Sequence, residues 1–507
     1  MTPGDAIRVE PWDEHNRALV ANVRPAGWVN PRPADRYNLV VIGAGTAGLV
    51  TAIGAAGLGA RVALVERDLM GGDCLNVGCV PSKALLRAAR ARADVGGAEG
   101  YGIRVPAGTR VDFGAVMERM RRVRARISGA DAAARYRDLG VDVFLGDGRF
   151  VGPAAIAVDG AALSFRKAVI ATGARATAPP IPGLAETGFL TNETVFALTA
   201  LPPRLAVIGA GPIGCELAQA FARFGARVTL LEVAPRILSR EDAAAAAIVA
   251  AALREDGVRI VTGAAIARVT RVADGKALHV GDEGAAPLVV DEILVGAGRA
   301  PNVRGLGLEA AGVAYDASAG VRVDDHLRTT NPRVFAAGDV CSSLRFTHHS
   351  DFQARIVIKN ALFLGRARVS ALTLPWCTYT DPEVAHVGMD EEAAAARGIR
   401  VRTLRQDLAG VDRAVLDGEE RGFVKIHLRE GTDAIVGATI VARHAGEMLP
   451  ELTLAIARGI GLGKIAETIH AYPTQAEAIR RLGDAYNRTR LTPGVRRVFR
   501  AWLRWTR

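Results

Sequence analysis

One segment of this 507-residue chain occurs twice in closely similar form. Residues 39–66 read LVVIGAGTAGLVTAIGAAGLGARVALVE and residues 205–232 read LAVIGAGPIGCELAQAFARFGARVTLLE, with 15 of 28 positions identical. Each copy starts with an apolar, β-branched run typical of a buried parallel strand and continues through Gly-x-Gly-x-x-Gly into residues suited to a helix. A second strand then ends in an acid. The pattern predicts a dinucleotide-binding unit.

The glycines of this repeat have separate mechanical roles. Gly43 makes the tight turn from strand to helix, Gly45 lets a pyrophosphate approach the backbone, and Gly48 allows the helix to pack closely on the strand. Glu66 can accept hydrogen bonds from a ribose. The equivalent residues of the second copy are Gly209, Gly211, Gly214 and Glu232. Two such units predict two cofactors, with electron transfer between them.

The acid that ends the second copy bears on the type of nicotinamide cofactor. A carboxylate at Glu232 would repel a 2′-phosphate, which favours NADH over NADPH. Arg236, four residues later, works against this preference.

Two cysteines follow the first copy, in the segment Gly71-Gly-Asp-Cys74-Leu-Asn-Val-Gly-Cys79-Val-Pro-Ser-Lys83. We expect a helix from Ser82 onward, and the spacing could place both sulfurs on one face at its edge. A metal site would need further Cys or His ligands at short spacing, and two inert buried thiols are another alternative. A reversible redox disulfide is favoured because the pair lies beside a dinucleotide unit, and a helix N-terminus would lower a thiol pKa. The isolated Cys215, Cys341 and Cys377 are interpreted as small buried hydrophobes.

The cysteine segment GGDCLNVGCVPSK resembles the redox-active segment of the pyridine nucleotide-disulfide oxidoreductases, such as dihydrolipoamide dehydrogenase, glutathione reductase and mercuric reductase. The resemblance runs from about Tyr37 to Asn487. Further motifs follow in the family's order: Ala171-Thr-Gly-Ala174, Gly298-Arg-Ala-Pro-Asn302, Phe335-Ala-Ala-Gly-Asp339, Tyr379-Thr-Asp-Pro-Glu383 and His470-Ala-Tyr-Pro-Thr-Gln-Ala-Glu477. The resemblance implies an α/β fold with two Rossmann-like domains, which bind FAD and NAD(P), a C-terminal α+β dimerisation domain, and a homodimer.

The resemblance also implies a role for each matching residue. Cys79 would be the charge-transfer thiol against the flavin and Cys74 the interchange thiol that meets the substrate. Lys83 would lie near flavin N5 with Glu216 as its ion-pair partner, and Asp339 would bind the ribityl chain. The other implied cofactor residues are Gly43, Gly45, Gly48, Glu66, Gly148, Thr172, Gly173, Arg345, Phe346, Thr347 and His348 for FAD, and Gly209, Gly211, Gly214, Glu232 and Gly298 for NAD. Electrons would pass from NADH through FAD to the disulfide, and the dithiol would reduce an acceptor.

The chain departs from the family's C-terminal motif. Disulfide-reducing members read H-x-H-P-T-x-x-E, in which the second His is the acid–base held by the Glu. This chain has Tyr472 at that position and retains Glu477. A Tyr titrates near ~10, so it is a poor base at neutral pH, although it can donate a hydrogen bond. His470 could substitute if the segment is extended, or it is a structural histidine. The departure puts ordinary dihydrolipoamide dehydrogenase activity in doubt.

Mercuric reductases also carry Tyr at this position, which tilts the interpretation toward that branch. They carry a C-terminal Cys pair as well, and residues 487–507 of this chain contain no cysteine. No metal-ligand set is therefore predicted beyond the two redox thiols. The predicted function is transfer of electrons from NAD(P)H through FAD to the Cys74–Cys79 disulfide, and on to a disulfide or a thiol-bound metal. The alternatives are dithiol oxidation with NAD⁺ and a flavin-containing redox sensor with little turnover.

The motifs predict a layout for the chain. An N-terminal extension covers residues 1–36, an FAD-binding domain 37–160 and 292–374, an NAD(P)-binding domain 161–291, an interface domain 375–487, and a basic amphipathic tail 488–507. Residues 111–139 are expected to form a basic, solvated helix. Residues 1–36 contain no apolar run typical of a secretory signal, so a cytoplasmic protein is expected.

The net charge of +11 is concentrated at the C-terminus. Seven arginines lie in the last 20 residues and leave +4 for the rest of the chain, which is ordinary for its size. Val495, Phe499, Trp502 and Leu503 can share one face of a helix that arginines surround. Such a helix could lie on an anionic membrane surface or pack on its own dimer. Nucleic acid is disfavoured because no binding motif accompanies the charge.

Overall fold

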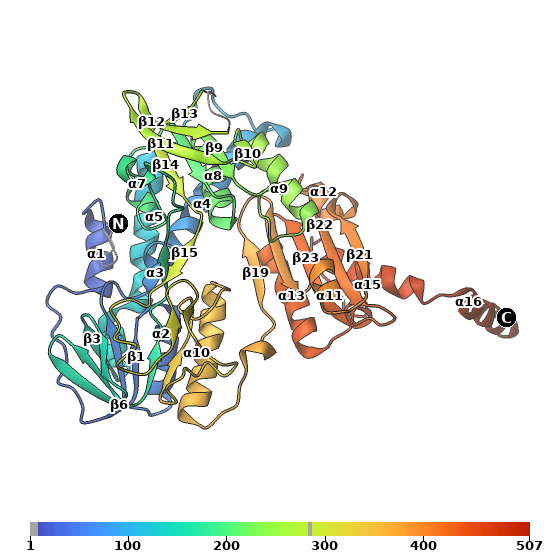
Figure 1. Ribbon diagram of the computed structural model, residues 1–507. Coiled ribbons are helices and arrows are strands. Elements are labelled where there is room, and N and C mark those ends of the chain that lie inside the picture. Colours follow the sequence, from blue (N-terminus) through green and yellow to red (C-terminus); the bar gives the residue numbers. More distant parts are fainter. Residues whose placement is uncertain (1–8, 282–285) are drawn as a thin grey trace. The chain divides into compact units, whose positions relative to one another are not determined.

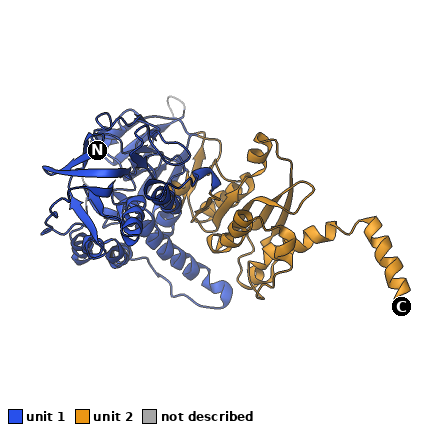
Figure 2. Ribbon diagram, turned by 90° about the horizontal axis from the view of Figure 1, so that it is seen from below, with its two compact units in different colours: residues 1–210, 217–233, 264–371 blue, residues 211–216, 234–263, 372–507 orange. Residues whose placement is uncertain are grey.

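The computed structural model describes residues 9–281 and 286–507, which form two compact units (Figures 1 and 2). Unit 1 comprises the chain up to residue 210 together with 217–233 and 264–371. Unit 2 comprises 211–216, 234–263 and 372–507. Among the described helices, none combines the length and the apolar character needed to cross a bilayer.

The first sheet of unit 1 is built around the strand that opens the first glycine repeat. Its order is β3-β2-β1-β6-β5-β4, and β18 also pairs with β6. The pairs β1–β2, β1–β6, β2–β3 and β6–β18 are parallel, whereas β4–β5 and β5–β6 are antiparallel. The strands are β1 (Tyr37–Ile42), β2 (Val62–Glu66), β3 (Val141–Leu145), β4 (Arg149–Gly152), β5 (Ala155–Val158), β6 (Ala161–Ile170) and β18 (Val334–Ala336).

Side chains from this sheet form a closely packed core. Tyr37, Phe144, Phe150 and Phe165 are all buried in it, with Val and Ile from the central strands. Helix α2 (Thr46–Gly57) contacts β1 and β2, and α10 (Thr347–Leu362) packs against α2. The predicted strand–turn–helix–strand unit is therefore present in the first repeat.

The second repeat forms a further parallel sheet. Strand β8 (Arg204–Ile208) lies between β9 (Arg227–Glu232) and β14 (Glu292–Val295), and α8 (Pro212–Phe224) follows β8. The smaller strand groups of unit 1 are β7 (Ala174–Ala176) with β15 (Arg299–Pro301), β11 (Ile266–Val272) with β12 (Gly275–Val280) and β13 (Leu288–Val290), and β16 (Tyr315–Asp316) with β17 (Gly320–Val321). The α/β class with two Rossmann-like units is confirmed.

Unit 2 contains an antiparallel sheet covered by helices, as expected for an α+β interface domain. Its order is β19-β20-β23-β22-β21, and every residue of β23 is buried. Helix α13 packs on β20 and β23, and α15 packs on β21. The strands are β19 (Pro375–Thr378), β20 (Glu383–Gly388), β21 (Val401–Asp407), β22 (Phe423–Arg429) and β23 (Ile435–Ala442). The other elements of unit 2 are α9 (Ala243–Glu255), β10 (Arg259–Thr262), α11 (Glu391–Ala396), α12 (Asp412–Leu416), α13 (Ala445–Arg458), α14 (Leu462–Ala466), α15 (Glu477–Thr489) and α16 (Pro493–Trp505).

The basic segment after the cysteines differs from its expectation. Residues 111–139 form two helices, α5 (Phe113–Ser128) and α6 (Ala133–Asp138), instead of one solvated helix. Arg121 and Arg124 on α5 are buried, with 7% and 5% of their surface exposed. The N-terminal region also contains α1 (Glu14–Val23), which packs against α5. The arginines are buried because α1 covers them.

The predicted boundaries between the two dinucleotide-binding regions, at 160/161 and 291/292, each assign a strand to the wrong sheet. Residues 161–170 form β6, which pairs with β1 in the first sheet, although the motifs placed them in the second region. Residues 292–295 form β14, which pairs with β8 in the second sheet. Hydrogen bonds to β1 and β8 decide to which sheet β6 and β14 belong, and the sequence motifs carry no information about these pairings.

Gly48 tests the packing of α2 on its strand. A methyl group there would lie 1.8 Å from the Gly43 carbonyl oxygen, whereas one at Gly57, in the same helix, would meet nothing within 4 Å. We expect Gly48→Ala to destabilise the protein by about 3 kcal/mol or more, seen as a lower melting temperature. Gly57→Ala should melt at or slightly above the native temperature because Ala favours helix. Equal melting of the two variants would contradict this packing.

Candidate functional site

The first glycine motif forms the turn between β1 and α2. Gly43 adopts φ +98°, and a side chain there would lie 2.4 Å from the Ala171 carbonyl oxygen. Gly45 is open by comparison, since its nearest neighbour would be the Cα of Gly72 at 3.8 Å. The turn therefore leaves room beside Gly45 and the first amides of α2, where a pyrophosphate group could bind.

The redox segment docks directly on this turn. The Gly71 amide donates to the Ala44 carbonyl oxygen at 2.8 Å. A side chain on Gly72 would lie 2.7 Å from the Cα of Gly45, so the two backbones touch. Because Cys74 is only two residues further on, the glycines at 71 and 72 place the cysteine segment beside the predicted cofactor turn.

The two cysteines lie on separate helices. Cys74 is in α3 (Gly72–Asn76), and Cys79 is the first residue of α4 (Cys79–Gly97). The expected helix start at Ser82 is therefore three residues late, and the pair does not share one helix face. A break at Val77 and Gly78 separates the helices, and Gly78 is needed there because a side chain would lie 2.7 Å from the Asp73 carbonyl oxygen.

The break brings the two sulfurs together with opposite acid–base character. The hydrogen bond from Cys74, aided by Thr347 and by the charge of Lys83, outweighs burial and lowers the pKa of Cys79 to about 6. The same hydrogen bond, together with burial, raises the pKa of Cys74. Thr347 Oγ1 lies 3.5 Å from the Cys79 sulfur. In the dithiol, Cys79 is therefore the thiolate and Cys74 the thiol that stabilises it.

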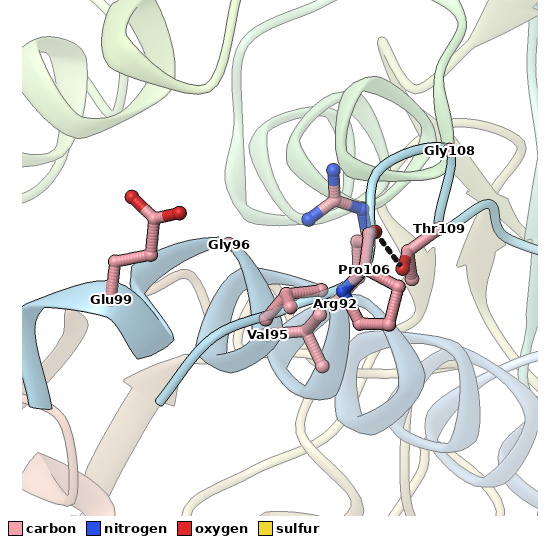
Figure 3. Close-up of a pocket in the computed structure, with 8 residues that line it drawn as sticks. Arg92, Val95, Gly96, Glu99, Pro106, Gly108 and Thr109 are labelled. Carbon is pink, nitrogen blue, oxygen red and sulfur yellow. Dashed lines mark hydrogen bonds between the residues drawn. The ribbon is translucent and has the colours of Figure 1, made fainter. Parts of the chain in front are cut away.

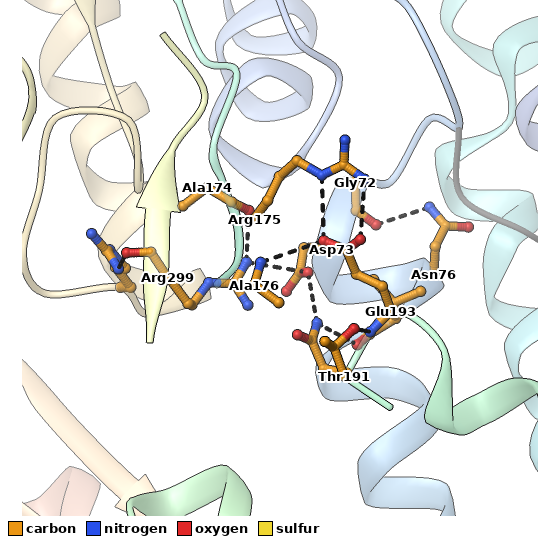
Figure 4. Close-up of polar contacts among 12 residues, drawn as sticks. Gly72, Asp73, Asn76, Ala174, Arg175, Ala176, Thr191, Glu193 and Arg299 are labelled. Atoms are coloured by element: carbon orange, nitrogen blue, oxygen red, sulfur yellow. Dashed lines mark hydrogen bonds and ion pairs between the residues drawn. The ribbon is translucent and has the colours of Figure 1, made fainter. Parts of the chain in front are cut away.

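A polar network holds the residue before Cys74 (Figure 4). Asp73 accepts from Arg299 at 3.2 Å and from the side-chain amide of Asn192 at 3.1 Å. Arg299 also donates to the Ala174 carbonyl oxygen, which links the β7–β15 pair to α3. Burial opposes the charge on Arg299, but Asp73 and Asp339 raise its pKa. Sequence reasoning did not select Asp73 and Asn192, and it quoted Arg299 only within a motif.

A buried arginine of α5 supports the same segment from the other side. Arg124 of α5 donates to the Asn76 carbonyl oxygen at 2.6 Å and to the Asn16 side-chain oxygen of α1 at 2.7 Å. Burial, followed by the nearby Arg121, lowers the pKa of Arg124 to about 10, so it stays charged at neutral pH. The sequence did contain a signal for this residue: Arg124 continues the helical spacing of the buried Phe113, Met117 and Met120.

The second glycine motif repeats the geometry of the first. Gly209 also adopts φ +98°. The Ala210 amide donates to Glu232 at 2.7 Å, as the Ala44 amide donates to Glu66 at 2.6 Å. Burial raises the pKa of Glu66. A side chain at Gly211 would meet nothing within 4 Å, and Gly214 lies within α8.

Several predicted FAD residues gather around the first turn. Thr172 Oγ1 donates to the Asn302 carbonyl oxygen, Asn302 donates back to Thr172, and Gly173 takes φ +68°. Gly148 packs against Val65, and a side chain on Gly298 would lie 2.8 Å from Thr177. These contacts join the Ala171–Ala174 and Gly298–Asn302 motifs into one framework.

The remaining FAD residues lie at the start of α10 and just before it. Thr347 reaches Cys79, Arg345 donates to the Arg299 carbonyl oxygen at 2.6 Å, and the rings of Phe346 and His348 stack with centroids 5.5 Å apart. Asp339 has no hydrogen-bond partner among the residues described, and burial raises its pKa. An unsatisfied, half-buried carboxylate beside an open glycine turn fits a ligand that carries hydroxyl groups, as the FAD ribityl chain does.

The predicted residues of unit 2 make contacts of their own. Glu216 is buried and accepts from the Tyr379 amide at 2.9 Å. Tyr472 is 69% exposed and donates to Asp412 at 2.9 Å, which raises the pKa of its phenol. Glu477 is buried and accepts from Arg480 and Arg481. Tyr472 and Glu477 thus have separate partners within this chain.

His470 has both ring nitrogens engaged. Nε2 lies 2.9 Å from Glu451 and Nδ1 lies 3.0 Å from the Thr468 carbonyl oxygen. Both ring nitrogens therefore face acceptor oxygens of this chain, and only 9% of the side-chain surface is exposed. The contacts favour the structural interpretation of this histidine.

A surface hollow lies at the far end of α4 (Figure 3). It is lined by Arg92, Val95, Gly96, Glu99, Val105, Pro106, Gly108 and Thr109. Cys79 begins α4 and Arg92 is 13 residues later, which is about 20 Å along a helix. The hollow is therefore separate from the cysteine pair.

Comparison with known proteins agrees with this geometry. Two family descriptions match: "Pyridine nucleotide-disulphide oxidoreductase" over residues 37–354, and its dimerisation domain over residues 374–482. A mercuric reductase of Bacillus cereus is 34% identical over 445 residues, which cover 88% of this chain and 70% of the relative. A dihydrolipoyl dehydrogenase of Thermus scotoductus is 35% identical over 464 residues, covering 89% and 98%.

Two solved structures share the fold across most of their length. The HOCl-induced flavoprotein disulfide reductase RclA of Escherichia coli superposes with a TM-score of 0.80 at 30% identity, covering 88% of this chain and 99% of that one. LpdA of Mycobacterium tuberculosis gives 0.81 at 28% identity, covering 89% and 100%. With the repeated glycine turns and the paired thiols, these matches show that the chain belongs to the pyridine nucleotide-disulfide oxidoreductase family, whose members are oxidoreductases acting on sulfur groups or metal ions.

Proposed function

We propose that this protein uses NADH to reduce a disulfide or a thiol-bound metal ion through the Cys74–Cys79 pair. The observation that carries the proposal is the hydrogen-bonded pair itself, docked on the first glycine turn, with the pKa of Cys79 lowered and that of Cys74 raised. The mercuric reductase relatives add a metal ion such as Hg(II) to the candidate acceptors.

FAD is the cofactor proposed for the first turn. The open side of Gly45, the amides at the start of α2 and the unsatisfied Asp339 would hold it. Bound FAD would supply the chemistry of accepting hydride from NADH and passing the electron pair to the disulfide. Lys83 lies one helical turn after Cys79 and lowers its pKa, so it would stabilise the thiolate that remains after reduction.

The two cysteines would then have different roles in reducing the acceptor. Reduction adds two electrons and one proton and leaves a Cys79 thiolate and a Cys74 thiol. Cys74 would attack the acceptor disulfide as a thiolate, because thiolates are the nucleophiles in exchange. This attack would form a mixed disulfide and expel one acceptor sulfur, which would take up the proton that Cys74 loses. The Cys79 thiolate would then attack the Cys74 sulfur, expel the second acceptor sulfur as a thiolate and restore the Cys74–Cys79 disulfide. For a metal ion, both thiolates would be ligands, since soft cations bind sulfur.

The C-terminal residues favour reduction over dithiol oxidation. Oxidising a dithiol requires a base to remove its proton, and the hydrogen bond to Asp412 raises the pKa of Tyr472 so that its phenol stays protonated at neutral pH. Both ring nitrogens of His470 are occupied by contacts within this chain. We therefore expect low activity toward dihydrolipoamide, although a dihydrolipoyl dehydrogenase is among the similar proteins. A phenol has one O–H, so Tyr472 would have to release Asp412 before it could donate to the acceptor.

The assembly and layout follow the family. The dimerisation-domain match at residues 374–482 supports a homodimer, and we place the protein in the cytoplasm. The proposed domains keep the predicted N-terminal, interface and tail regions. We propose that the FAD-binding region extends through β6 to Ile170 and that the NAD-binding region extends through β14 to Val295, because those strands complete the two sheets.

The cysteine pair provides the main test. We expect Cys74→Ser and Cys79→Ser to lower NADH-dependent turnover by at least about 100-fold, because each removes a sulfur that exchange requires. Cys377→Ser is the matched control and should keep full activity, since Cys377 lies in β19, outside the Cys74–Cys79 segment. Steady-state NADH oxidation would be measured with glutathione disulfide, Hg(II) in excess thiol, lipoamide and a quinone.

Each outcome of that panel is informative. Unchanged turnover of Hg(II) or of the disulfide by Cys74→Ser or Cys79→Ser would refute the proposed route. Turnover of the quinone alone, or of no acceptor, would favour the redox-sensor alternative. Fast reduction of NAD⁺ by dihydrolipoamide would overturn the argument from Tyr472.

Asp73 should modulate the thiolate. Its carboxylate disfavours a negative charge on Cys79, so Asp73→Asn should shift the pKa of Cys79 below about 6 and speed alkylation of the reduced protein at mildly acidic pH. Asp138→Asn, at an exposed carboxylate on α6, is the matched control. Iodoacetamide labelling at several pH values, with mass spectrometry of the Cys79 peptide, would measure the shift. A pKa that stays fixed or rises in Asp73→Asn would contradict the electrostatic role.

The preference for NADH is tested at Glu232. Arg236 donates to the carbonyl oxygens of Leu238, Ser239 and Glu241, so its guanidinium is already engaged. We expect kcat/KM for NADH to exceed that for NADPH by about tenfold or more. Glu232→Gln should raise kcat/KM for NADPH and so lower the NADH-to-NADPH ratio of kcat/KM. The amide oxygen of Gln can still accept from the Ala210 amide, but it does not repel a 2′-phosphate. A ratio near one in the native enzyme would refute the preference.

A further inference from the structure

The C-terminal helix α16 is a well-formed helix that no described part of the chain buries. Thr492 caps its start by accepting from the Val495 amide, and Pro493 occupies the first turn, where its missing N–H costs nothing. Within the described residues, none of those in α16 is buried. Isolated helices of this length are marginal in water, so a partner surface would stabilise it.

The side chains of α16 divide into an apolar face and a cationic face. Val495, Val498, Phe499 and Trp502 follow the spacing i, i+3, i+4 and i+7, and Trp505 packs beside Trp502 with ring centroids 5.2 Å apart. The apolar face is open: Val498, Phe499, Trp502, Leu503 and Trp505 are between 53% and 77% exposed. The opposite face consists of Arg496, Arg497, Arg500 and Arg504.

We propose that α16 binds peripherally to a membrane surface that contains anionic phospholipid. The apolar face would enter the boundary between headgroups and acyl chains, with the two tryptophans at the level where such rings partition. The arginines would lie above it and donate to lipid phosphates. The proposal concerns the tail alone and does not depend on the proposed reaction.

Charge complementarity selects this partner. No acid follows Asp484 in the sequence, and among the residues described no carboxylate pairs with an arginine of α16. A protein surface would have to present matched acids around an apolar groove, whereas a bilayer offers mobile phosphates beside an apolar layer. The α16 helix of a second copy fits less well because it presents the same four arginines and no acid. Nucleic acid would satisfy the arginines but leave the apolar face in water.

The test uses the full-length holoprotein and co-sedimentation with two kinds of vesicle, phosphatidylcholine alone and phosphatidylcholine with phosphatidylglycerol. We expect binding to the anionic vesicles at low salt, weaker binding at high salt, and little binding to phosphatidylcholine. Phe499→Ser combined with Trp502→Ser should reduce anionic-vesicle binding by about tenfold or more. Trp12→Ser is the matched control, because Trp12 is 57% exposed and Trp502 is 58% exposed.

A second variant separates local charge from net charge. Changing Arg496, Arg497, Arg500 and Arg504 to Gln should reduce anionic-vesicle binding by at least about 100-fold. The control changes Arg122, Arg137, Arg355 and Arg400 to Gln, since their side chains are 60–88% exposed and their surface ion pairs contribute little. This control lowers the net charge equally and should keep most of the binding.

The remaining outcomes would overturn the proposal. Equal sedimentation of the native protein and both tail variants would exclude the membrane contact. If the four-Gln variant of α16 and the four-Gln control lost vesicle binding equally, the attraction would come from net charge and not from α16. Equal binding to both kinds of vesicle would remove the role of the arginines. A change in oligomeric state of the tail variants by analytical ultracentrifugation, with vesicle binding unchanged, would show that a second copy covers the face.

Discussion

The contact between the glycines at 71 and 72 and the first glycine turn organises the redox site. The hydrogen bond from Gly71 to Ala44 and the close approach of Gly72 to Gly45 leave no room for a side chain between the two segments. A turn shaped for a pyrophosphate and a segment that carries a thiol pair are thereby joined through backbone alone. The rest of unit 1 supports this junction, because β1, β6 and β18 align the turn with the Ala171–Ala174 segment behind it.

Two arginines support the junction from either side. Arg299 holds Asp73 at one end of α3, and Arg124 holds the Asn76 carbonyl oxygen at the other. Arg124 and Asn76 are both buried, so their hydrogen bond satisfies polar groups that would be costly to leave unpaired in a protein interior. Arg124 also binds Asn16, so the N-terminal helix α1 belongs to the framework of the cysteine segment instead of being an appendage. The opposite pKa shifts of Cys74 and Cys79 arise in the segment that these contacts hold.

The sequence predicted the elements with strong local signals. The repeat predicted both strand–turn–helix–strand units, and the family resemblance implied the α+β domain that follows them. The start of α4 was predicted three residues late because the break at Gly78 depends on contact with Asp73, which no local pattern reveals. The solvated helix over residues 111–139 was a wrong prediction, since its arginines become buried only when α1 packs on α5.

The sequence by itself determined the chemistry that this protein can use: two dinucleotide turns, a thiol pair beside the first turn, Tyr472 in place of a histidine, and a tail of arginines without acids. Glycine spacing and residue type are local properties, so the chain order records them directly. The tertiary structure decided which groups meet. Asp73 with Arg299, Asn76 with Arg124 and Cys79 with Thr347 are distant along the chain, and their pKa values and burial depend on packing that sets distance and dielectric environment together.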